Sequence, residues 1–232
     1  MAVTPQYCPV AMATEIVSDR WTPLILRELI VGAHSFSEIH KGIPHLSRTL
    51  LSERLKQLVS HGIIERREAQ GGRPKYWLTP AGQDLQDLIF GLGEWAIRWA
   101  YFTDPTEKQL DNTHLMWRFQ RGVVRERLPD RRVVVEFVLT CPGGAIERIW
   151  LVIEPDEVDT CLKPPAFETD IEVRTTSHEL HRIWLGRTTM EEAIRAGTLQ
   201  VEGPPAMVRD LPQWFSFSPF APTVRRAVEA AG

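Results

Sequence analysis

"LSRTLLSERLKQLVSHGIIERREAQGGRPKYWLTPAG", residues 46–82, is the stretch that decides the fold. It joins a serine-started helical segment to two short strand segments around a Gly-Gly-Arg-Pro turn. Ser47 stands where an N-cap belongs, and Gly62 stands where a left-handed residue would end the helix. One apolar face recurs at helical spacing and is predicted to be buried: Leu51, Leu55, Leu58 and Val59.

The side of this predicted helix that faces away from the leucines is polar. At about 100° per residue, hydroxyl and basic side chains share that side near the helix N-terminus. They are Ser47, Arg48, Thr49, Ser52 and Lys56. Arg54 lies on a flank, where a phosphate or an acidic neighbour such as Glu38 or Glu53 can pair with it.

The segments around this helix complete a recognisable unit. Residues 63–68 and 75–79 are predicted strands, and the glycine-containing segment 69–74 between them predicts a β-hairpin. Upstream, Thr22 begins an amphipathic run that Gly32 ends, and Ser35 with Glu38 forms a capping box for a short helix. Helix, short helix, polar-faced helix and hairpin together predict a winged helix-turn-helix.

A helix of this kind fits the DNA major groove, which is about 12 Å wide, with its N-terminal residues toward the base edges. The hairpin would then bring Arg73 and Lys75 to the phosphate backbone or the minor groove. Residues 41–75 contain eight basic and three acidic residues, although the whole chain has a net charge of −3. We therefore expect this region to read double-stranded DNA. The alternative is a packing module, because helix-turn-helix shapes also occur in proteins that bind no DNA.

Residues 8 to about 100 resemble the HxlR-type branch of the MarR-like winged-helix regulators. The matching pieces are Cys8-Pro9, Trp21 followed by LILREL, FSEI at 36–39, the serine and leucine pattern at 47–66, and Y.LT..G at 76–82. One departure is Asp19-Arg20, where the family has a Gly-Lys pair. The resemblance implies a dimeric transcriptional regulator, and we expect a repressor that binds a pseudo-palindromic operator.

Cys8 raises the question of a redox trigger. Some members of the resembling family use a cysteine at this place as an oxidation or electrophile sensor. Cys8 precedes a helix that should begin near Pro9, and a helix N-terminus stabilises a thiolate. No lysine or arginine lies nearby in the sequence, so a plain small buried residue is the alternative.

Residues 81–101 form a predicted helix with apolar side chains on both sides, and such a helix must be covered on both sides. A twofold contact in a homodimer supplies one cover. The residues expected in that contact are Leu88, Leu92, Trp95 and Trp99. Burial under the chain's own second domain is the alternative.

The sequence changes character near residue 102, which predicts two domains, 1–102 and 103–232, with the polar segment 102–112 as linker. In the second domain, residues 114–120, 131–140, 147–154 and 171–176 are predicted strands of an antiparallel meander. The predicted helices that follow are one capped by Ser177 and ended by Gly186, one boxed by Thr188 and Glu191 and ended by Gly197, and one over 205–215 after a short strand at 199–203. The fold class is therefore α+β.

Residues 176–215 resemble the end of sterol-carrier-protein-like domains in the order helix, helix ending in glycine, short strand and helix. The resemblance implies a sheet covered by helices around an apolar tunnel for a hydrophobic small-molecule effector. The aromatic side chains that can line this pocket, or simply fill the core, are Trp117, Phe119, Phe137, Trp150, Trp184, Trp214 and Phe215.

Other function classes have little support. The sequence has no recognisable Ser/His/Asp set, P-loop or dinucleotide glycine pattern, so we predict neither an enzyme nor a cofactor. Its three cysteines and its histidines have no metal-ligand spacing, and no run of eighteen apolar residues occurs. We expect a cytoplasmic DNA-binding regulator without membrane contact. The runner-up is a lipid carrier or effector-binding protein in which the winged helix serves only dimerisation.

Overall fold

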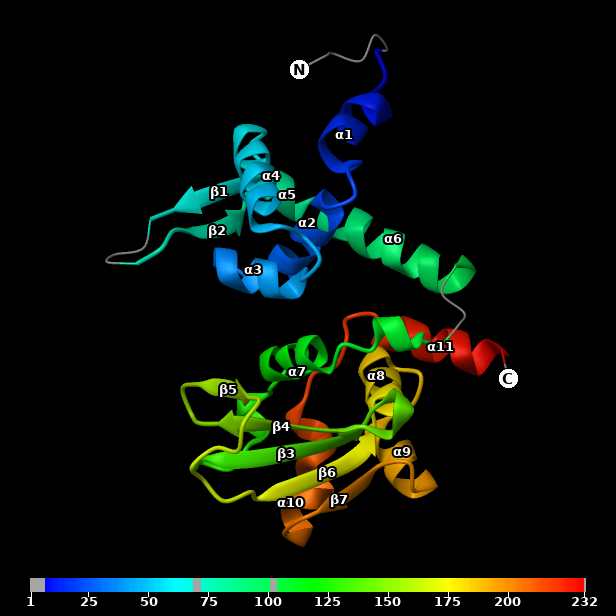
Figure 1. Ribbon diagram of the computed structural model, residues 1–232. Coiled ribbons are helices and arrows are strands. Elements are labelled where there is room, and N and C mark those ends of the chain that lie inside the picture. The colour runs from blue at the N-terminus through cyan, green and yellow to red at the C-terminus, as the bar shows by residue number, and fades with distance from the viewer. Residues whose placement is uncertain (1–6, 69–71, 101–103, 232) are drawn as a thin grey trace. The chain divides into compact units, whose positions relative to one another are not determined.

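The computed structural model describes residues 7–68, 72–100 and 104–231. The chain divides into two compact units, Met1–Trp95 and Ala96–Gly232, each with its own apolar core (Figure 1). The predicted boundary at residue 102 lies outside the described residues, as does the predicted hairpin tip at 69–71. No helix in the described ranges is long and apolar enough to cross a membrane.

The N-terminal unit is a helical bundle with a two-stranded hairpin. Its elements are α1 (Pro9–Val17), α2 (Thr22–Ile30), α3 (Phe36–Gly42), α4 (Arg48–Ser60), β1 (Ile64–Arg67), β2 (Lys75–Leu78) and α5 (Pro80–Gln83), followed by α6 (Gln86–Trp99), which continues past the unit boundary. Ser47 caps α4 by accepting a hydrogen bond from the Leu50 backbone N–H at 3.3 Å. Ser35 and Glu38 form the predicted capping box of α3. The element order is that of the predicted winged helix-turn-helix.

The core of this unit lies where α2, α3 and α4 meet the hairpin. Leu51, Leu55 and Leu58 of α4 are buried as predicted. Val59 is not, because it lies at the edge of the leucine face in the last turn of α4 and is 37% exposed. Strands β1 and β2 pair antiparallel, with Ile64 opposite Leu78 and Arg67 opposite Lys75.

The C-terminal unit is a mixed sheet with helices, which places the whole chain in the α+β class. Its sheet contains β3 (Val133–Thr140), β4 (Ile146–Ile153), β5 (Val158–Cys161), β6 (Ile171–Thr176) and β7 (Gln200–Glu202), in the order β5-β4-β3-β6-β7. Its helices are α7 (Asn112–Arg121), α8 (Ser177–Leu185), α9 (Met190–Ala196), α10 (Pro205–Asp210) and α11 (Ala221–Ala231) (Figure 1). The larger apolar cluster of the unit joins one face of the sheet to α7, α8, α9 and α10.

The predicted antiparallel meander is confirmed for the pairing of β3 with β4 and is wrong for the strand at 171–176. Strand β3 pairs antiparallel with β4 on one side but parallel with β6 on the other, with Val135 opposite Ile171. After β5 the chain crosses to the far side of β3, which a long connection permits. Turn residues in the sequence mark where strands end, but they do not determine the side on which the next strand pairs.

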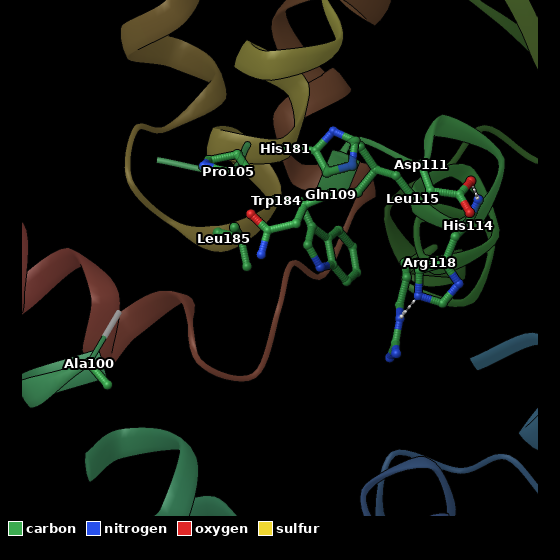
Figure 2. A pocket seen from close by; sticks show the side chains of 10 residues that line it. All are labelled: Ala100, Pro105, Gln109, Asp111, His114, Leu115, Arg118, His181, Trp184 and Leu185. Carbon is green, nitrogen blue, oxygen red and sulfur yellow. Dashed lines mark hydrogen bonds between the residues drawn. The ribbon is translucent and has the colours of Figure 1, made fainter. Parts of the chain in front are cut away.

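The predicted strand over residues 114–120 is also wrong, because this segment belongs to helix α7. Asp111 caps the helix by accepting a hydrogen bond from the His114 backbone N–H at 2.9 Å (Figure 2). Leu115, Met116 and Phe119 are buried, and their spacing is that of one helical face. The segment contains no β-branched residue that would favour a strand.

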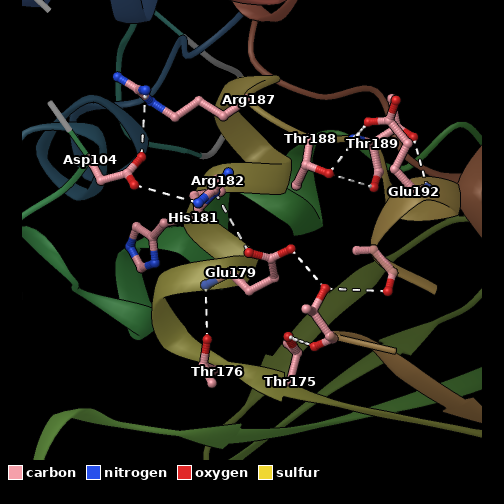
Figure 3. Close-up of polar contacts among 12 residues, drawn as sticks. Asp104, Thr175, Thr176, Glu179, His181, Arg182, Arg187, Thr188, Thr189 and Glu192 are labelled. Atoms are coloured by element: carbon pink, nitrogen blue, oxygen red, sulfur yellow. Dashed lines mark hydrogen bonds and ion pairs between the residues drawn. The ribbon is translucent and has the colours of Figure 1, made fainter. Parts of the chain in front are cut away.

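Two predicted helix starts are displaced by one residue. Thr176, and not Ser177, caps α8 by accepting from the Glu179 backbone N–H (Figure 3). The capping box of α9 is formed by Thr189 with Glu192, and not by Thr188 with Glu191. Each site has a tandem pair of hydroxyl residues, so the sequence offers two equivalent N-caps. The predicted ends are confirmed, because Gly186 and Gly197 take left-handed conformations after α8 and α9.

Candidate nucleic-acid interface

Helix α4 turns its leucines into the core and its polar residues outward. Arg48, Thr49 and Lys56 are exposed, and Ser52 is half-buried. Their positions along α4 place these four on one side of the helix, and the N-cap Ser47 stands at its start. The Arg48 guanidinium lies 5.2 Å from the centre of the Phe36 ring of α3. The structure thus brings the five predicted α4 residues to one side of the helix, between its N-cap and its third turn.

The hairpin supplies a second group of cations. Arg73 and Lys75 are exposed, and the Lys75 backbone forms a β-bridge with Ser35 at the start of α3. Arg66 and Arg67 instead form ion pairs with glutamates of their own strand region. Within the described part of the chain, none of the cations Arg48, Lys56, Arg73 and Lys75 makes an ion pair. These four side chains therefore carry uncompensated charge that can neutralise phosphates.

An ion pair between Arg27 and the buried Glu28 lies where α2 contacts the end of α3. Glu28 is fully buried, and its Oε1 accepts from Arg27 Nη2 at 2.7 Å. The same Arg27 nitrogen donates to the Gly42 carbonyl oxygen at 3.3 Å. A side chain at Gly42 would overlap the Glu28 carboxylate, so this position accepts only glycine without a shift. The pair joins α2 to the last residue of α3, just ahead of the turn into α4.

Arg54 belongs to the scaffold, and its partner differs from the two acids considered from the sequence. Its Nη1 lies 3.5 Å from Asp19 Oδ2 and donates to Gln57 Oε1 at 2.7 Å. Asp19 also accepts from the Trp21 backbone N–H at 2.8 Å, just before α2. Asp19 stands where the HxlR-type pattern has glycine. Its carboxylate orders the start of α2 and contacts Arg54 of α4.

Comparison with known proteins agrees with this geometry. A family model described as HxlR-like helix-turn-helix matches residues 16–104. The HTH-type transcriptional regulator YvaP of Bacillus subtilis strain 168 is 37% identical over 97 residues, which are 40% of this chain and 90% of YvaP. The chain belongs to the HxlR-like helix-turn-helix family.

Other HxlR-like relatives match the same N-terminal part. The HTH-type transcriptional regulator YodB of Bacillus subtilis is 36% identical over 92 residues, 38% of this chain and 82% of YodB. A regulator of Mycobacterium tuberculosis strain H37Rv, Rv3095, is 41% identical over 90 residues, 37% of this chain and 55% of its own length. The solved reduced form of YodB superimposes with a TM-score of 0.37 at 32% identity, covering 43% of this chain and 100% of that one.

Cys8 is half-buried and free, and it occupies the N-cap position of α1 in this HxlR-like chain. The predicted helix start at Pro9 is confirmed. The Cys8 side chain makes no capping hydrogen bond. Its role as a redox sensor stays a prediction.

Helix α6 exposes an apolar stripe. Ile89 and Ile97 are buried on one side. The opposite side carries the four residues predicted for a dimer contact, all of them largely exposed in the single chain: Leu88, Leu92, Trp95 and Trp99. The side chain of Trp95, for example, is 60% exposed. Large apolar side chains in one row are unusual on the surface of a monomer.

The aromatic residues predicted to line a pocket are not grouped around one space. Phe119, Phe137 and Trp214 are almost fully buried in the main core of the C-terminal unit, and the Phe119 and Phe137 rings lie 5.8 Å apart. Trp184 packs partly buried against that core. Trp150 belongs to a separate small cluster with Val134, and the Trp117 ring lies beside His114 and two arginines.

Among the described residues, no group of three or more His, Cys, Asp or Glu side chains is placed to hold a metal ion.

Two features of the structure were not predicted from the sequence. Asp19 was not predicted as the partner of Arg54, since the two residues lie far apart in the chain. A cavity lined by residues of α7 and α8 was not predicted either, because residues 114–120 were predicted as a strand.

Proposed function

We propose that this HxlR-like protein is a DNA-binding transcriptional regulator whose α4 reads base edges in the major groove. A DNA-binding regulator is the function that the family and its relatives support. The base-reading residues are Ser47, Arg48, Thr49, Ser52 and Lys56, and the wing residues Arg73 and Lys75 bind phosphates. The observation that carries this assignment is the set of four exposed cations on α4 and the hairpin that make no ion pair with any described residue.

The second part of the proposal is a homodimer formed through α6. Four exposed apolar residues along one helix side, ending in Trp95 and Trp99, support a twofold contact. A twofold dimer presents two α4 helices to one side of the duplex. Its operator should then be a pseudo-palindrome with half-site centres about one helical turn, or a multiple of it, apart. A dimer that covers such a site excludes other proteins from it, so we propose repression as the outcome.

Selection of bound sequences from random DNA with the purified full-length protein tests this function. The proposal predicts a pseudo-palindromic consensus whose affinity falls with salt. Asymmetric single half-sites would contradict the dimeric docking. Absence of any enriched sequence would favour the runner-up, in which the winged helix serves only dimerisation.

We propose the remainder of the chain, residues 103–232, as the region that binds an effector. A cavity of about 560 Å³ lies beside the start of α9, within the size range of small-molecule sites. Apolar side chains dominate its lining, among them Ile183, Met190, Phe215 and Phe217. Of the aromatic residues predicted for a ligand pocket, the described lining contains Phe215 and none of the others. This apolar cavity supports a hydrophobic effector, as the sterol-carrier resemblance implied.

Decanoate is a suitable probe for the apolar cavity. An effector must bind the DNA-competent and DNA-incompetent dimers unequally, and a coupling of about 1–3 kcal/mol changes operator affinity about 5- to 150-fold. Decanoate should quench tryptophan fluorescence and shift an operator titration by such a factor. Tryptophan quenching without a change in operator affinity would contradict regulation by the ligand. It would favour the second candidate function, a lipid carrier or effector-binding protein.

A further inference from the structure

The apolar cavity beside α9 has charged groups at its wall. Four segments of the C-terminal unit surround it: the end of α8, the start of α9, residues 215–219 and the start of α11. Among the described residues that line it, the ionisable ones are Glu191 of α9 and Arg225 of α11. The charge that these two side chains offer to a ligand determines which class of hydrophobic molecule the cavity accepts.

Arg225 is already paired with carboxylates of its own unit. Its Nη1 donates to Glu192 Oε2 at 2.6 Å, its Nη2 donates to Glu192 Oε1, and its Nε donates to Glu229 Oε1 at 2.8 Å. The Thr189 backbone N–H also donates to Glu192, at 2.9 Å (Figure 3). A ligand carboxylate at this cavity would therefore compete with two carboxylates for one guanidinium.

Glu191, in contrast, has a carboxylate that no cation neutralises by direct contact. Its side chain is exposed and makes no ion pair with any described residue. Arg195, one turn further along α9, donates to the Glu191 backbone carbonyl oxygen at 3.4 Å and not to the carboxylate. The Glu191 carboxylate is thus available to a positively charged ligand.

The charges around the cavity sum to a negative value. The ionisable side chains that line it, or that hydrogen-bond to those that do, are Glu191, Glu192, Glu229, Arg195 and Arg225. Carboxylates outnumber guanidinium groups in this set. An excess of negative charge attracts a cation and repels an anion.

Aromatic rings in the lining also favour a cation. Phe215 and Phe217 line the cavity, and the Phe217 ring makes edge contacts with Phe119 and Trp184 at centre distances of 6.1 and 6.4 Å. The face of an aromatic ring attracts an ammonium group, and quaternary ammonium ligands are recognised in this way. Met190 adds apolar surface for an alkyl chain. A carboxylate and aromatic rings beside an apolar space are the groups that a lipophilic cation requires.

We propose that the apolar cavity binds an alkylammonium ion, that is, a hydrophobic molecule with a cationic head group. Glu191 pairs with the ammonium group, Phe217 contacts it, and the alkyl chain packs against Met190. This inference rests on the proposed effector function of the cavity and names the chemical class of the ligand. Decanoate shares the alkyl chain and still binds, but more weakly, because its charge has the opposite sign.

Isothermal titration calorimetry of the full-length protein compares three ligands with the same ten-carbon chain. They are decyltrimethylammonium, 1-decanol and decanoate, each used below the concentration at which it aggregates. We expect saturable binding of one decyltrimethylammonium ion per chain. Its affinity should exceed that of the alcohol at least about fivefold and that of decanoate at least about tenfold.

Glu191→Gln should weaken binding of the cation about fivefold and leave the affinity for decanol unchanged. Phe217→Leu keeps an apolar side chain but removes the ring face, so it should also weaken the cation more than the alcohol. Glu202→Gln is the matched control, because Glu202 is an exposed carboxylate on β7 of the same unit that does not line the cavity. It should leave both affinities as in the wild-type protein.

Equal affinity of the wild-type protein for the cation and the alcohol would overturn the proposal and leave the hydrophobic-effector function intact. This comparison does not depend on the folding of any variant. Absence of binding by all three ligands would overturn both the inference and the effector function. Equal losses of cation affinity in Glu191→Gln and Glu202→Gln would also overturn the inference, because net charge and not the cavity lining would then determine binding.

Discussion

Lys75 is fixed in position although its side chain is exposed. Its backbone bridges to Ser35 and pairs with Arg67, while its ammonium has no ion pair among the described residues. A phosphate contact carries no sequence information. Lys75→Ala should therefore weaken binding to all DNA sequences alike and lower the slope of log affinity against log salt by about one. Fluorescence anisotropy titrations at several salt concentrations measure this slope.

Arg195→Ala is the control for this change, because it removes one exposed positive charge from α9 in the C-terminal unit. It should leave the salt slope as in the wild-type protein. An equal loss of slope in both variants would show that net charge, and not the wing, determines the effect.

The pKa of Glu192 depends on its contacts with neighbouring residues. Arg225 Nη1 donates to its carboxylate at 2.6 Å, and the Thr189 backbone N–H adds a bond at 2.9 Å. The Arg225 hydrogen bonds are the main cause that lowers the pKa of Glu192 from 4.5 to about 2. Because the folded pKa is depressed, the stabilisation is present above pH 4.5 and is lost as the pH falls toward 2.

Arg225→Gln should raise the pKa of Glu192 most of the way back toward 4.5, with the backbone bond from Thr189 retaining part of the shift. Carboxyl carbon NMR titration of the full-length protein measures it. Arg226→Gln changes the neighbouring arginine, for which no ion pair to Glu192 is described, and should leave the pKa of Glu192 near 2. An unchanged value in Arg225→Gln would contradict the contact.

At the scale of elements, the junction between the wing and α5 is tightly packed. Thr79 Oγ1 donates to the Gly62 carbonyl oxygen at 2.6 Å and caps α5 by accepting from the Gly82 backbone N–H at 3.2 Å. A Cβ at Gly82 would overlap the backbone carbonyl oxygen of Ile63. Gly82→Ala should destabilise the protein by about 1–3 kcal/mol, since the backbone must move.

Urea unfolding of Gly82→Ala measures this loss. Gln83→Ala is the control from the next position, because Gln83 is exposed and its truncation should change the free energy of unfolding by less than about 0.5 kcal/mol. Equal stability of the two variants would show that the wing and α5 can separate at little cost.

Elements defined by local signals were predictable from the sequence. Ser35, Ser47 and Thr22 mark helix starts through nearby hydrogen bonds or spacing, and Gly186 and Gly197 mark helix ends. The starts of α8 and α9 were displaced because tandem hydroxyl residues offer equivalent caps. Helix α7 was missed, although the Asp111 cap and the spacing of Leu115 and Phe119 are local signals in the sequence.

Features that depend on distant contacts were not predictable. The parallel pairing of β3 with β6 depends on where the chain crosses the sheet, and no local pattern determines this. The Arg54 contact with Asp19 and the cavity between α7 and α8 join segments far apart in the sequence. The α4 candidates could be predicted because helical period alone places them on one side.

At the scale of the whole molecule, the proposed dimer depends on the α6 stripe. Trp95 is exposed in the single chain, so Trp95→Glu should not disturb the monomer fold, but it would place an unpaired charge in the dimer contact. We expect the variant to sediment as a monomer and to lose operator affinity. Gln86→Glu adds the same charge at an exposed position on the other side of α6 and should remain dimeric. An intact Trp95→Glu dimer would contradict the assignment.

The central claim is that α4 reads DNA bases, and the ratio of operator affinity to nonspecific affinity tests it most directly. Ser52→Ala and Arg48→Ala should each reduce specific binding by about 1–3 kcal/mol, or about 5- to 150-fold, with nonspecific binding changed much less by the serine variant. Ser60→Ala removes a hydroxyl from the far end of α4 and should bind as the wild-type protein does. Folded Ser52→Ala and Arg48→Ala proteins that keep the wild-type ratio would contradict the account.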